Sequence, residues 1–377
     1  MPGGGSGNEE CGQGTCFAVD FAVKSYRIRL HFPQGSRIRE PSSFMLANIS
    51  CAQSSGSTAL SHSLDRHPDI ACGAELFLFC HRLLHTDYRQ FRTRARLTRL
   101  IGLSNLPFST NRSLFRHLRD FGLTKSQFWG WAREADSLPD LARRMHDHVR
   151  HLSGKQNWVE KTPWNIFAIP SFLESFPEAR VIHLVRDPRD VILSLCRRSR
   201  DKDPLRAAQH WFTAVAAAQS SRNHDRVLEV RYEDLCHDSD RELARICAFL
   251  GVNFDPAYFR DDTHASRGLH RWSGYTAWTS RPDAGFSEVS VGRYRTASID
   301  WSPFSALRLT GPFAAAVGTR PWTLPDLARS YGYELADAGQ DGEFIPLHLP
   351  RPLDPLRRTL DSWTGRPGYF PQLEQRR

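Results

Sequence analysis

The chain has 377 residues, of which 40% are hydrophobic and 24% are charged, and this size predicts one large α/β domain with appendages, or two domains. The formal net charge of +9 favours anionic ligands or acidic partners, although a coding bias towards arginine explains it equally well. Because the chain has neither a run of about 18 apolar residues nor a CxxC pair, no membrane span and no zinc ribbon are expected.

The two ends of the chain differ in composition from its centre. Residues 1–40 open with a glycine-rich stretch and are predicted to be disordered. They contain no basic segment followed by an apolar core, so no secretory signal is expected and a cytoplasmic location is predicted. Residues 336–377 form a proline-rich tail. The range 41–335 between them is predicted to be one domain, with an arginine-dense helical insertion over 77–157.

Strand and helix patterns alternate through the predicted domain. The apolar run "FMLANIS" predicts a buried strand, followed by a small polar loop and the helix "STALSHSLDRH". Further on, the strand "RVIHLV" leads into "DVILSLCRRSR", for which Asp187 is the expected N-cap and Pro188 the first helical residue. The strand "RVLEVR" then precedes an amphipathic helix that ends at Gly251. Strands that are apolar on both faces predict a parallel sheet covered by helices on both sides.

Within the helical insertion, Thr124 and Gln127 form a capping-box signature. Phe128, Trp129 and Trp131 follow it, and they either belong to the core or stack on a ligand.

Two strand ends in this pattern suggest one anion site. The first is the loop 54–58, "SSGST", whose backbone N–H groups and following helix start can hold an anion without a side-chain charge. It lacks the GxxxxGK spacing of a Walker A motif, and it fits an ordinary strand-to-helix turn as well. The second is Arg186, and Ser194 follows two turns into the next helix, roughly 9 Å along its axis. An arginine there also fits a simple ion pair with Asp187 or Asp190.

Several motifs together resemble one known family. They are "CAQSSGSTAL", "HPDIACGAE", "EKTPWN", "FPEARVIHLVRDPRDVILS", "VRYEDL" and "VGRYR". The combination resembles sulfotransferases that use 3′-phosphoadenosine 5′-phosphosulfate (PAPS), in the bacterial and Golgi-type branch that includes tyrosylprotein and carbohydrate sulfotransferases. The resemblance implies a P-loop-type three-layer α/β fold, with a central parallel sheet flanked by helices, and an insertion over 77–157 that covers the acceptor.

The resemblance also implies which residues bind the nucleotide. The loop would hold the 5′-phosphosulfate, Arg186 and Ser194 would hold the 3′-phosphate, and Tyr232 would line the nucleotide pocket. Gly292 and Arg293 match a late segment that closes over the nucleotide. The predicted nucleotide-binding set is Ser54, Ser55, Gly56, Ser57, Thr58, Arg186, Ser194, Tyr232, Gly292 and Arg293.

Two catalytic residues follow from the same resemblance. Glu75 matches a carboxylate that deprotonates the acceptor hydroxyl, and Lys161 matches a lysine that neutralises the leaving group. Each also has a simpler interpretation as an exposed charged residue. The acceptor is left open between a sugar, a peptide tyrosine and a small molecule. The pairs His81/His85 and His146/His148 have no acidic motif to organise them, so no metal site is predicted.

Ser54 stands where the family usually has arginine or lysine. Losing one preorganised charge at such a site costs about 3–4 kcal/mol of barrier, or roughly 10²–10³ in rate. Lys161, Arg293 or the arginines of "CRRSR" are candidates to compensate. The alternative is a catalytically impaired protein that binds PAPS or its product. A P-loop kinase is disfavoured by the missing GK[ST], and a nucleic-acid binder by the scattered charges.

Overall fold

A computed structural model describes residues 17–23, 26–32, 45–73, 75–93, 96, 118, 121–198, 203–265, 285–309, 321–335 and 345–347. The chain divides into two compact units, Met1–Phe44 and Met45–Arg377. The first unit contains an antiparallel pair of strands, β1 (Phe17–Val23) and β2 (Tyr26–Phe32), in a register from Phe17↔Phe32 to Val23↔Tyr26. These strands correct the expectation of disorder at their own positions within 1–40.

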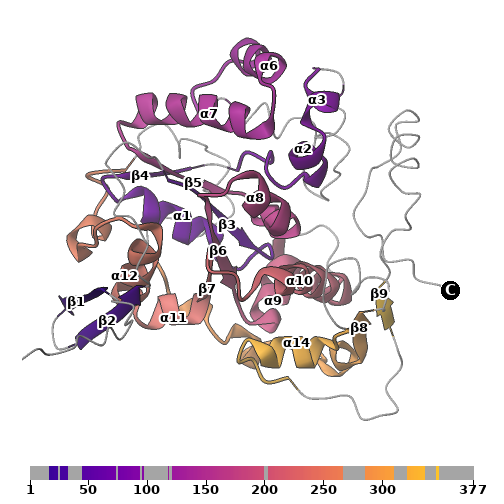
Figure 1. The fold of residues 1–377 in the computed structure, drawn as a ribbon. Coiled ribbons are helices and arrows are strands. Elements are labelled where there is room, and N and C mark those ends of the chain that lie inside the picture. Colours follow the sequence, from indigo (N-terminus) through magenta and orange to yellow (C-terminus); the bar gives the residue numbers. More distant parts are fainter. Residues whose placement is uncertain are drawn as a thin grey trace, which may run out of the picture. The chain divides into compact units, whose positions relative to one another are not determined.

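The second unit is built on a five-stranded sheet in the order β4-β5-β3-β6-β7, in which every neighbouring pair is parallel (Figure 1). The strands are β3 (Leu46–Cys51), β4 (Ile70–Cys72), β5 (Asn157–Lys161), β6 (Arg180–Val185) and β7 (Val227–Arg231). All six residues of β3 are buried, as expected for a strand covered on both faces. The parallel sheet predicted from the apolar runs is therefore confirmed.

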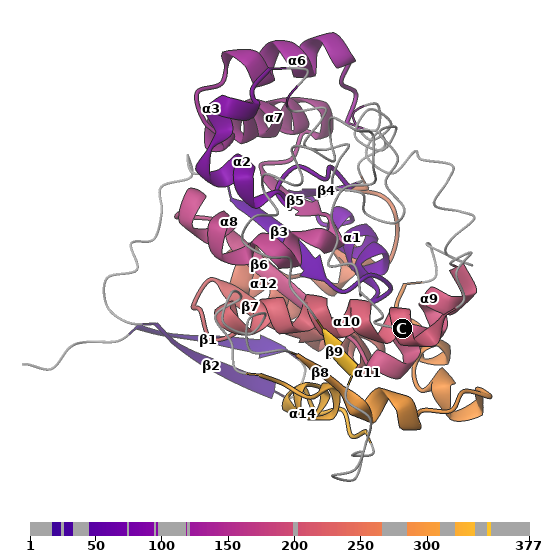
Figure 2. The same cartoon turned by 90° about the vertical axis from the view of Figure 1, so that its right-hand side faces the viewer.

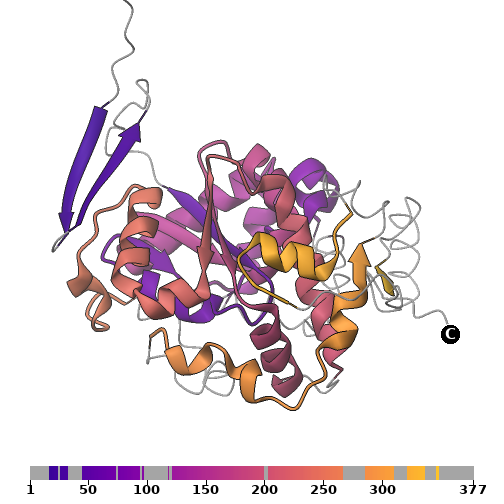
Figure 3. The same ribbon diagram turned by 90° about the horizontal axis from the view of Figure 1, so that it is seen from below.

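Helices cover both faces of this sheet, as the view from below in Figure 3 shows. Successive residues of β3 contribute to two separate cores, Leu46 to one and Ala47 and Ile49 to the other. The core that contains Ile49 is completed by α1 (Ser57–Asp65), α11 (Tyr232–His237) and α12 (Ser239–Leu250). The core that contains Leu46 is completed by α8 (Ile169–Ser175), α9 (Pro188–Arg198), α10 (Pro204–Ala218) and α14 (Leu324–Ser330).

The described part of 77–157 is mostly helical. It contains α2 (Arg82–Thr86), α3 (Tyr88–Phe91), α6 (Lys125–Glu134) and α7 (Leu138–Ser153), and α6 and α7 lie together at one end of the unit (Figure 2). The capping box of Thr124 and Gln127 is present. Phe128 is fully buried, and Trp129 and Trp131 pack against the same core, so this aromatic cluster is part of the packing. Most of 94–120 lies outside the described residues.

Short elements connect and follow the main layers. They are the 3₁₀ helices η1 (Pro163–Ala168), η2 (Gln219–Ser221), η3 (Pro256–Phe259), η5 (Glu288–Ser290), η6 (Arg293–Thr296) and η7 (Ser302–Ala306), and the parallel strands β8 (Leu307–Leu309) and β9 (Ile345–Leu347). The strand β9 lies within the predicted tail 336–377, most of which is outside the described residues. None of the helices in the described ranges has the length and apolar character that crossing a membrane requires.

Candidate functional site

The carboxyl ends of neighbouring strands bring the predicted site residues to one edge of the sheet. In the strand register Ile49 pairs with Lys161 and Cys51 with Leu184. The chain runs from β3 to β4 on one side and later reaches β6 on the other side of β3. The edge beside β3 is therefore a topological switch point, which is where open parallel sheets bind their ligands.

The loop after β3 has an unusual backbone at two positions. Ser54 has a φ of 71° and Gly56 a φ of 99°, and α1 begins at Ser57. A Cβ atom on Gly56 would lie 2.3 Å from Cδ2 of Tyr232, so only glycine fits there. The hydroxyl groups of Ser54 and Ser55 are buried and have no hydrogen-bond partner among the described residues. The loop therefore combines unpaired donors, the N–H groups of a helix start and a close wall of aromatic ring.

Arg186 lies directly against this loop. Its guanidinium donates from Nη1 to the Ser54 carbonyl oxygen at 3.1 Å and from Nη2 to the Ser290 carbonyl oxygen. It also stacks on the Tyr232 ring, with 4.5 Å between Cζ and the ring centroid. Arg186 is only 6% exposed, and burial raises the pKa of Tyr232 to about 12. The two strand ends singled out in the sequence thus meet through one guanidinium.

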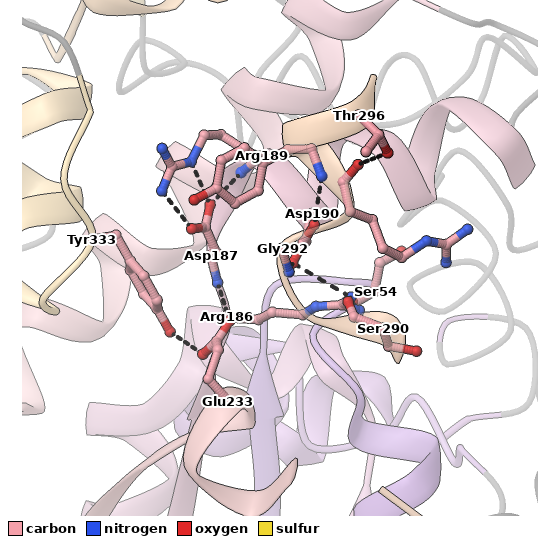
Figure 4. A network of polar contacts seen from close by, with 12 residues as sticks. Ser54, Arg186, Asp187, Arg189, Asp190, Glu233, Ser290, Gly292, Thr296 and Tyr333 are labelled. Atoms are coloured by element: carbon pink, nitrogen blue, oxygen red, sulfur yellow. Dashed lines mark hydrogen bonds and ion pairs between the residues drawn. The ribbon is translucent and has the colours of Figure 1, made fainter. Parts of the chain in front are cut away.

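Asp190 and Arg189 hold the late segment against the start of α9 (Figure 4). Asp190 accepts from the backbone N–H of Gly292 at 2.7 Å and of Tyr294 at 3.2 Å. The Arg189 guanidinium stacks on the Tyr294 ring at 3.7 Å. Burial raises the pKa of Asp190 above its usual range, while the Gly292 N–H and Arg186 act against that shift. These contacts fix the position of Gly292 next to Arg186.

A second set of contacts fixes the turn that carries Arg186. Asp187 accepts from the backbone N–H of Arg189 at 2.9 Å, which confirms it as the N-cap of α9. Its carboxylate also binds the Arg189 side chain at 2.7 Å. Of the two ion pairs that the sequence left open for Arg186, the one with Asp190 is present, at 4.0 Å. Glu233 accepts from the Asp187 N–H at 2.9 Å and from the Tyr333 hydroxyl at 2.7 Å (Figure 4).

Two of the predicted nucleotide-binding residues are more exposed to solvent than Arg186. Ser194 is on α9 and is half-buried. Arg293 follows Gly292 at the start of η6 and is exposed. Their nucleotide-binding role stays a prediction.

The two predicted catalytic residues contact each other. Lys161 Nζ donates to Glu75 Oε1 at 2.9 Å, and the Lys161 side chain is 1% exposed while that of Glu75 is 21% exposed. Both act electrostatically on the buried thiol of Cys51, which in turn hydrogen-bonds the side chain of Ser57. Lys161 pairs with Ile49 of β3 in the strand register, so the pair lies at the sheet edge from which the loop after β3 begins.

The chemistry of this edge is that of an anion site with an acid–base pair beside it. Backbone N–H groups and Arg186 can bind two separate anionic groups, and Glu75 can accept a proton next to the Lys161 cation. Sequence reasoning missed Glu233, Ser290 and the contact of Asp190 with Gly292, because these roles depend on contacts between residues that are far apart in the chain. In the part of the chain that the structure describes, no cluster of three metal-ligating side chains occurs.

Comparison with known proteins gives one family. The model described as "Sulfotransferase family" matches residues 48–256. Sulfotransferase 2A2 of Rattus norvegicus is 26% identical over 128 residues, which cover 29% of this chain and 44% of the relative. The 3-alpha-hydroxysteroid sulfotransferase of Cavia porcellus is 31% identical with the same coverage. The matches thus span about half the length of these curated relatives.

Two solved structures share the fold. The sulfotransferase domain of the Synechococcus PCC 7002 olefin synthase is 21% identical, with a TM-score of 0.52 over 79% of this chain and 99% of that domain. The sulfotransferase domain of the curacin biosynthetic pathway is 19% identical, with a TM-score of 0.50 over 78% of this chain and 99% of that domain. They confirm the predicted P-loop-type α/β fold.

Proposed function

Since this chain belongs to the sulfotransferase family, we propose that it transfers a sulfuryl group from PAPS to a hydroxyl group of an acceptor. The observation that supports the proposal most strongly is the contact between the two strand ends, where Arg186 binds the Ser54 carbonyl oxygen at 3.1 Å. A nucleotide with a phosphate at each end requires two anion sites next to each other. The bacterial and Golgi-type branch suggested by the motifs stays a prediction.

The nucleotide-binding roles follow from this arrangement. The N–H groups of 55–58 and the α1 start would bind the 5′-phosphosulfate. The Tyr232 ring, which fills the space beside Gly56, would form a wall of that site. Arg186 and Ser194 would bind the 3′-phosphate, Tyr232 would line the pocket, and Gly292 with Arg293 would close it. The buried, unpaired hydroxyls of Ser54 and Ser55 fit such a ligand, because each can donate to it.

Glu75 and Lys161 would carry out the proton transfer and the charge stabilisation. Glu75 would take the proton of the acceptor hydroxyl while the acceptor oxygen bonds to sulfur and the bond from sulfur to the 5′-phosphate oxygen breaks. The Lys161 ammonium would stabilise the charge that develops on that phosphate oxygen. The sulfuryl group carries less charge than a γ-phosphoryl group, so the proposal includes no metal.

A second candidate function rests on Ser54. The loop lacks the cation that the family usually has there, and the Ser54 carbonyl is already bound to Arg186. A chain with this loop that binds the nucleotide and transfers slowly is the alternative, because one missing charge costs roughly 10²–10³ in rate.

A binding and turnover experiment separates the two candidates. Calorimetric titration with adenosine 3′,5′-bisphosphate and with ATP tests the ligand, and labelled PAPS with a panel of sugar, tyrosine-peptide and small-molecule hydroxyls tests turnover. Tight bisphosphate binding with turnover supports transfer, and turnover only in Ser54→Arg supports the alternative. Ser220→Arg, an exposed site after α10, is the charge-matched control. A preference for ATP would contradict both candidates.

We also propose the cytoplasm as the compartment. The described cysteines are all free thiols, which is usual where glutathione and thioredoxin keep thiols reduced. Fractionation of the native cells with an antibody to the chain tests this.

A further inference from the structure

The segment that carries Glu75 has no regular structure to hold it. Residues 75–77 lie between the end of β4 at Cys72 and the start of α2 at Arg82, and they belong to no helix or strand. Phe77 has a φ of 55°, which is unfavourable for a residue with a side chain. Such a backbone persists only where its surroundings determine it. The contacts of this segment therefore decide where the Glu75 carboxylate lies.

Two side chains of the "EKT" sequence hold this backbone. The Thr162 hydroxyl oxygen accepts from the N–H groups of Leu76 and Phe77, each at 3.1 Å. Oε1 of Glu160 accepts from the same Leu76 N–H at 2.9 Å and from the Thr162 hydroxyl at 2.6 Å. The peptide that directly follows Glu75 is thus fixed by two acceptors that are also bound to each other.

Both carboxylate oxygens of Glu160 accept hydrogen bonds from neighbouring groups. Glu160 is 1% exposed, and its second oxygen accepts from Asn165 Nδ2 at 2.6 Å. Burial raises the pKa of Glu160, and the hydrogen bonds from Thr162, Leu76 and Asn165 act against this shift. All of these partners donate, which suits a carboxylate that only accepts. A buried carboxylate with such a set of donors is a rigid anchor rather than an exposed charge.

Lys161 lies between these two anchors in the sequence and contacts Glu75 from the other side. Glu160 and Lys161 are consecutive residues of β5, so their side chains leave opposite faces of the sheet. Lys161 binds the Glu75 carboxylate, while Glu160 and Thr162 bind the backbone after Glu75. One strand end therefore fixes Glu75 at both its side chain and its main chain.

We propose that Glu160 and Thr162 are positioning residues, which set the Glu75 carboxylate against Lys161 for proton removal from the acceptor. This inference rests on the proposed sulfuryl transfer and assigns two residues outside the predicted site. Glu160 and Thr162 touch neither the acceptor nor the nucleotide in this scheme. Their effect is on the placement of the base, and a misplacement of about 1 Å can cost about 10²-fold in rate.

The substitution Thr162→Val tests the proposal, because it keeps the volume and removes the acceptor of the Phe77 N–H. We expect kcat for transfer from PAPS to fall about 10- to 10²-fold. The Kd for adenosine 3′,5′-bisphosphate should stay within about twofold, and amide hydrogen exchange should rise in the peptide that contains 75–79. Thr162→Ser, which keeps the hydroxyl, should restore the rate. Thr213→Val, which removes a buried hydroxyl on α10 bonded to the Gln209 carbonyl, is the matched control and should leave kcat and this exchange unchanged.

The outcomes distinguish this inference from the proposed function. A wild-type kcat in Thr162→Val, an equal loss in Thr213→Val, or unchanged exchange at 75–79 would overturn the positioning role. If the wild-type chain neither binds the bisphosphate nor transfers from PAPS, the proposed function fails. The hold of Glu160 and Thr162 on the backbone after Glu75 is then judged by amide exchange at 75–79 alone. If Thr162→Val does not fold, Glu160→Gln takes its place. A drop in kcat of more than about threefold at unchanged bisphosphate Kd supports the role, and no drop contradicts it.

Discussion

Replacing Gly56 by alanine is expected to damage both stability and nucleotide binding. A Cβ atom at this position would lie 2.3 and 2.4 Å from two carbons of the Tyr232 ring, well inside van der Waals contact. The ring cannot easily move, because it is 5% exposed and the Arg186 guanidinium stacks on it. Any shift of Tyr232 therefore shifts Arg186 as well.

The magnitude follows from two separate costs. A side chain at a φ of 99° costs about 1–2 kcal/mol, and forcing an extra methyl group into a packed site costs about 1–3 kcal/mol. Gly56→Ala should therefore lower the free energy of unfolding by about 2–5 kcal/mol. Gly154 has a φ of 74°, and a Cβ atom added there would meet no atom within 4 Å, so Gly154→Ala should cost only about 1–2 kcal/mol.

Urea unfolding measures the first effect, and calorimetric titration with adenosine 3′,5′-bisphosphate measures the second. We expect the bisphosphate Kd to rise at least about tenfold in Gly56→Ala, the loss of one strong charged contact, and to stay unchanged in Gly154→Ala. The reasoning is refuted if the two variants lose equal stability and both bind the bisphosphate like the wild type.

Three further predictions concern buried charge. Burial lowers the pKa of His183 to about 3 from its ordinary value near 6.5. The folded state should therefore lose stability as the pH falls below 6.5, by about 2 kcal/mol at pH 5 from this group. In His183→Phe, the difference between the free energies of unfolding measured in urea at pH 7.5 and at pH 5 should be smaller by this amount. Lys155 is 5% exposed and lies 3.4 Å from the Asp65 carboxylate, so Lys155→Met should lower the free energy of unfolding by about 3–5 kcal/mol, whereas a loss under about 1 kcal/mol would contradict the buried ion pair. Asp190→Ala removes the acceptor of the Gly292 N–H, so amide hydrogen exchange in 290–296 should rise. The bisphosphate Kd should increase about tenfold, which corresponds to the loss of one hydrogen bond to a charged group. Unchanged amide exchange would show that other contacts hold this segment.

The sequence is informative where one residue or one short segment determines the structure. Apolar runs such as "RVIHLV" predict the buried strands, and Asp187 and Pro188 predict the start of α9. The motifs predict the loop and Arg186, and the structure places these at adjacent strand ends.

What the sequence could not show depends on contacts between distant segments or on weak local signals. The Lys24-Ser25 dipeptide between β1 and β2 lacks the Asn-Gly or Asp-Gly signature of a tight hairpin. The apolar run "FAVDFAV" and the alternation in "YRIRLHF" therefore do not by themselves predict the pair. Glu160 stands in a quoted motif, but its role depends on the backbone of Leu76, 84 positions earlier. The contact of Asp190 with Gly292 likewise joins residues 102 positions apart.

A crystal structure of the chain with adenosine 3′,5′-bisphosphate tests the central claim most directly. The account predicts one nucleotide across the β3–β6 edge, with its 5′-phosphate at the N–H groups of 55–58 and its 3′-phosphate at the Arg186 guanidinium and Ser194. A nucleotide bound elsewhere, or one that touches the loop while Arg186 stays on Ser54 and Ser290 without contacting a phosphate, would contradict it.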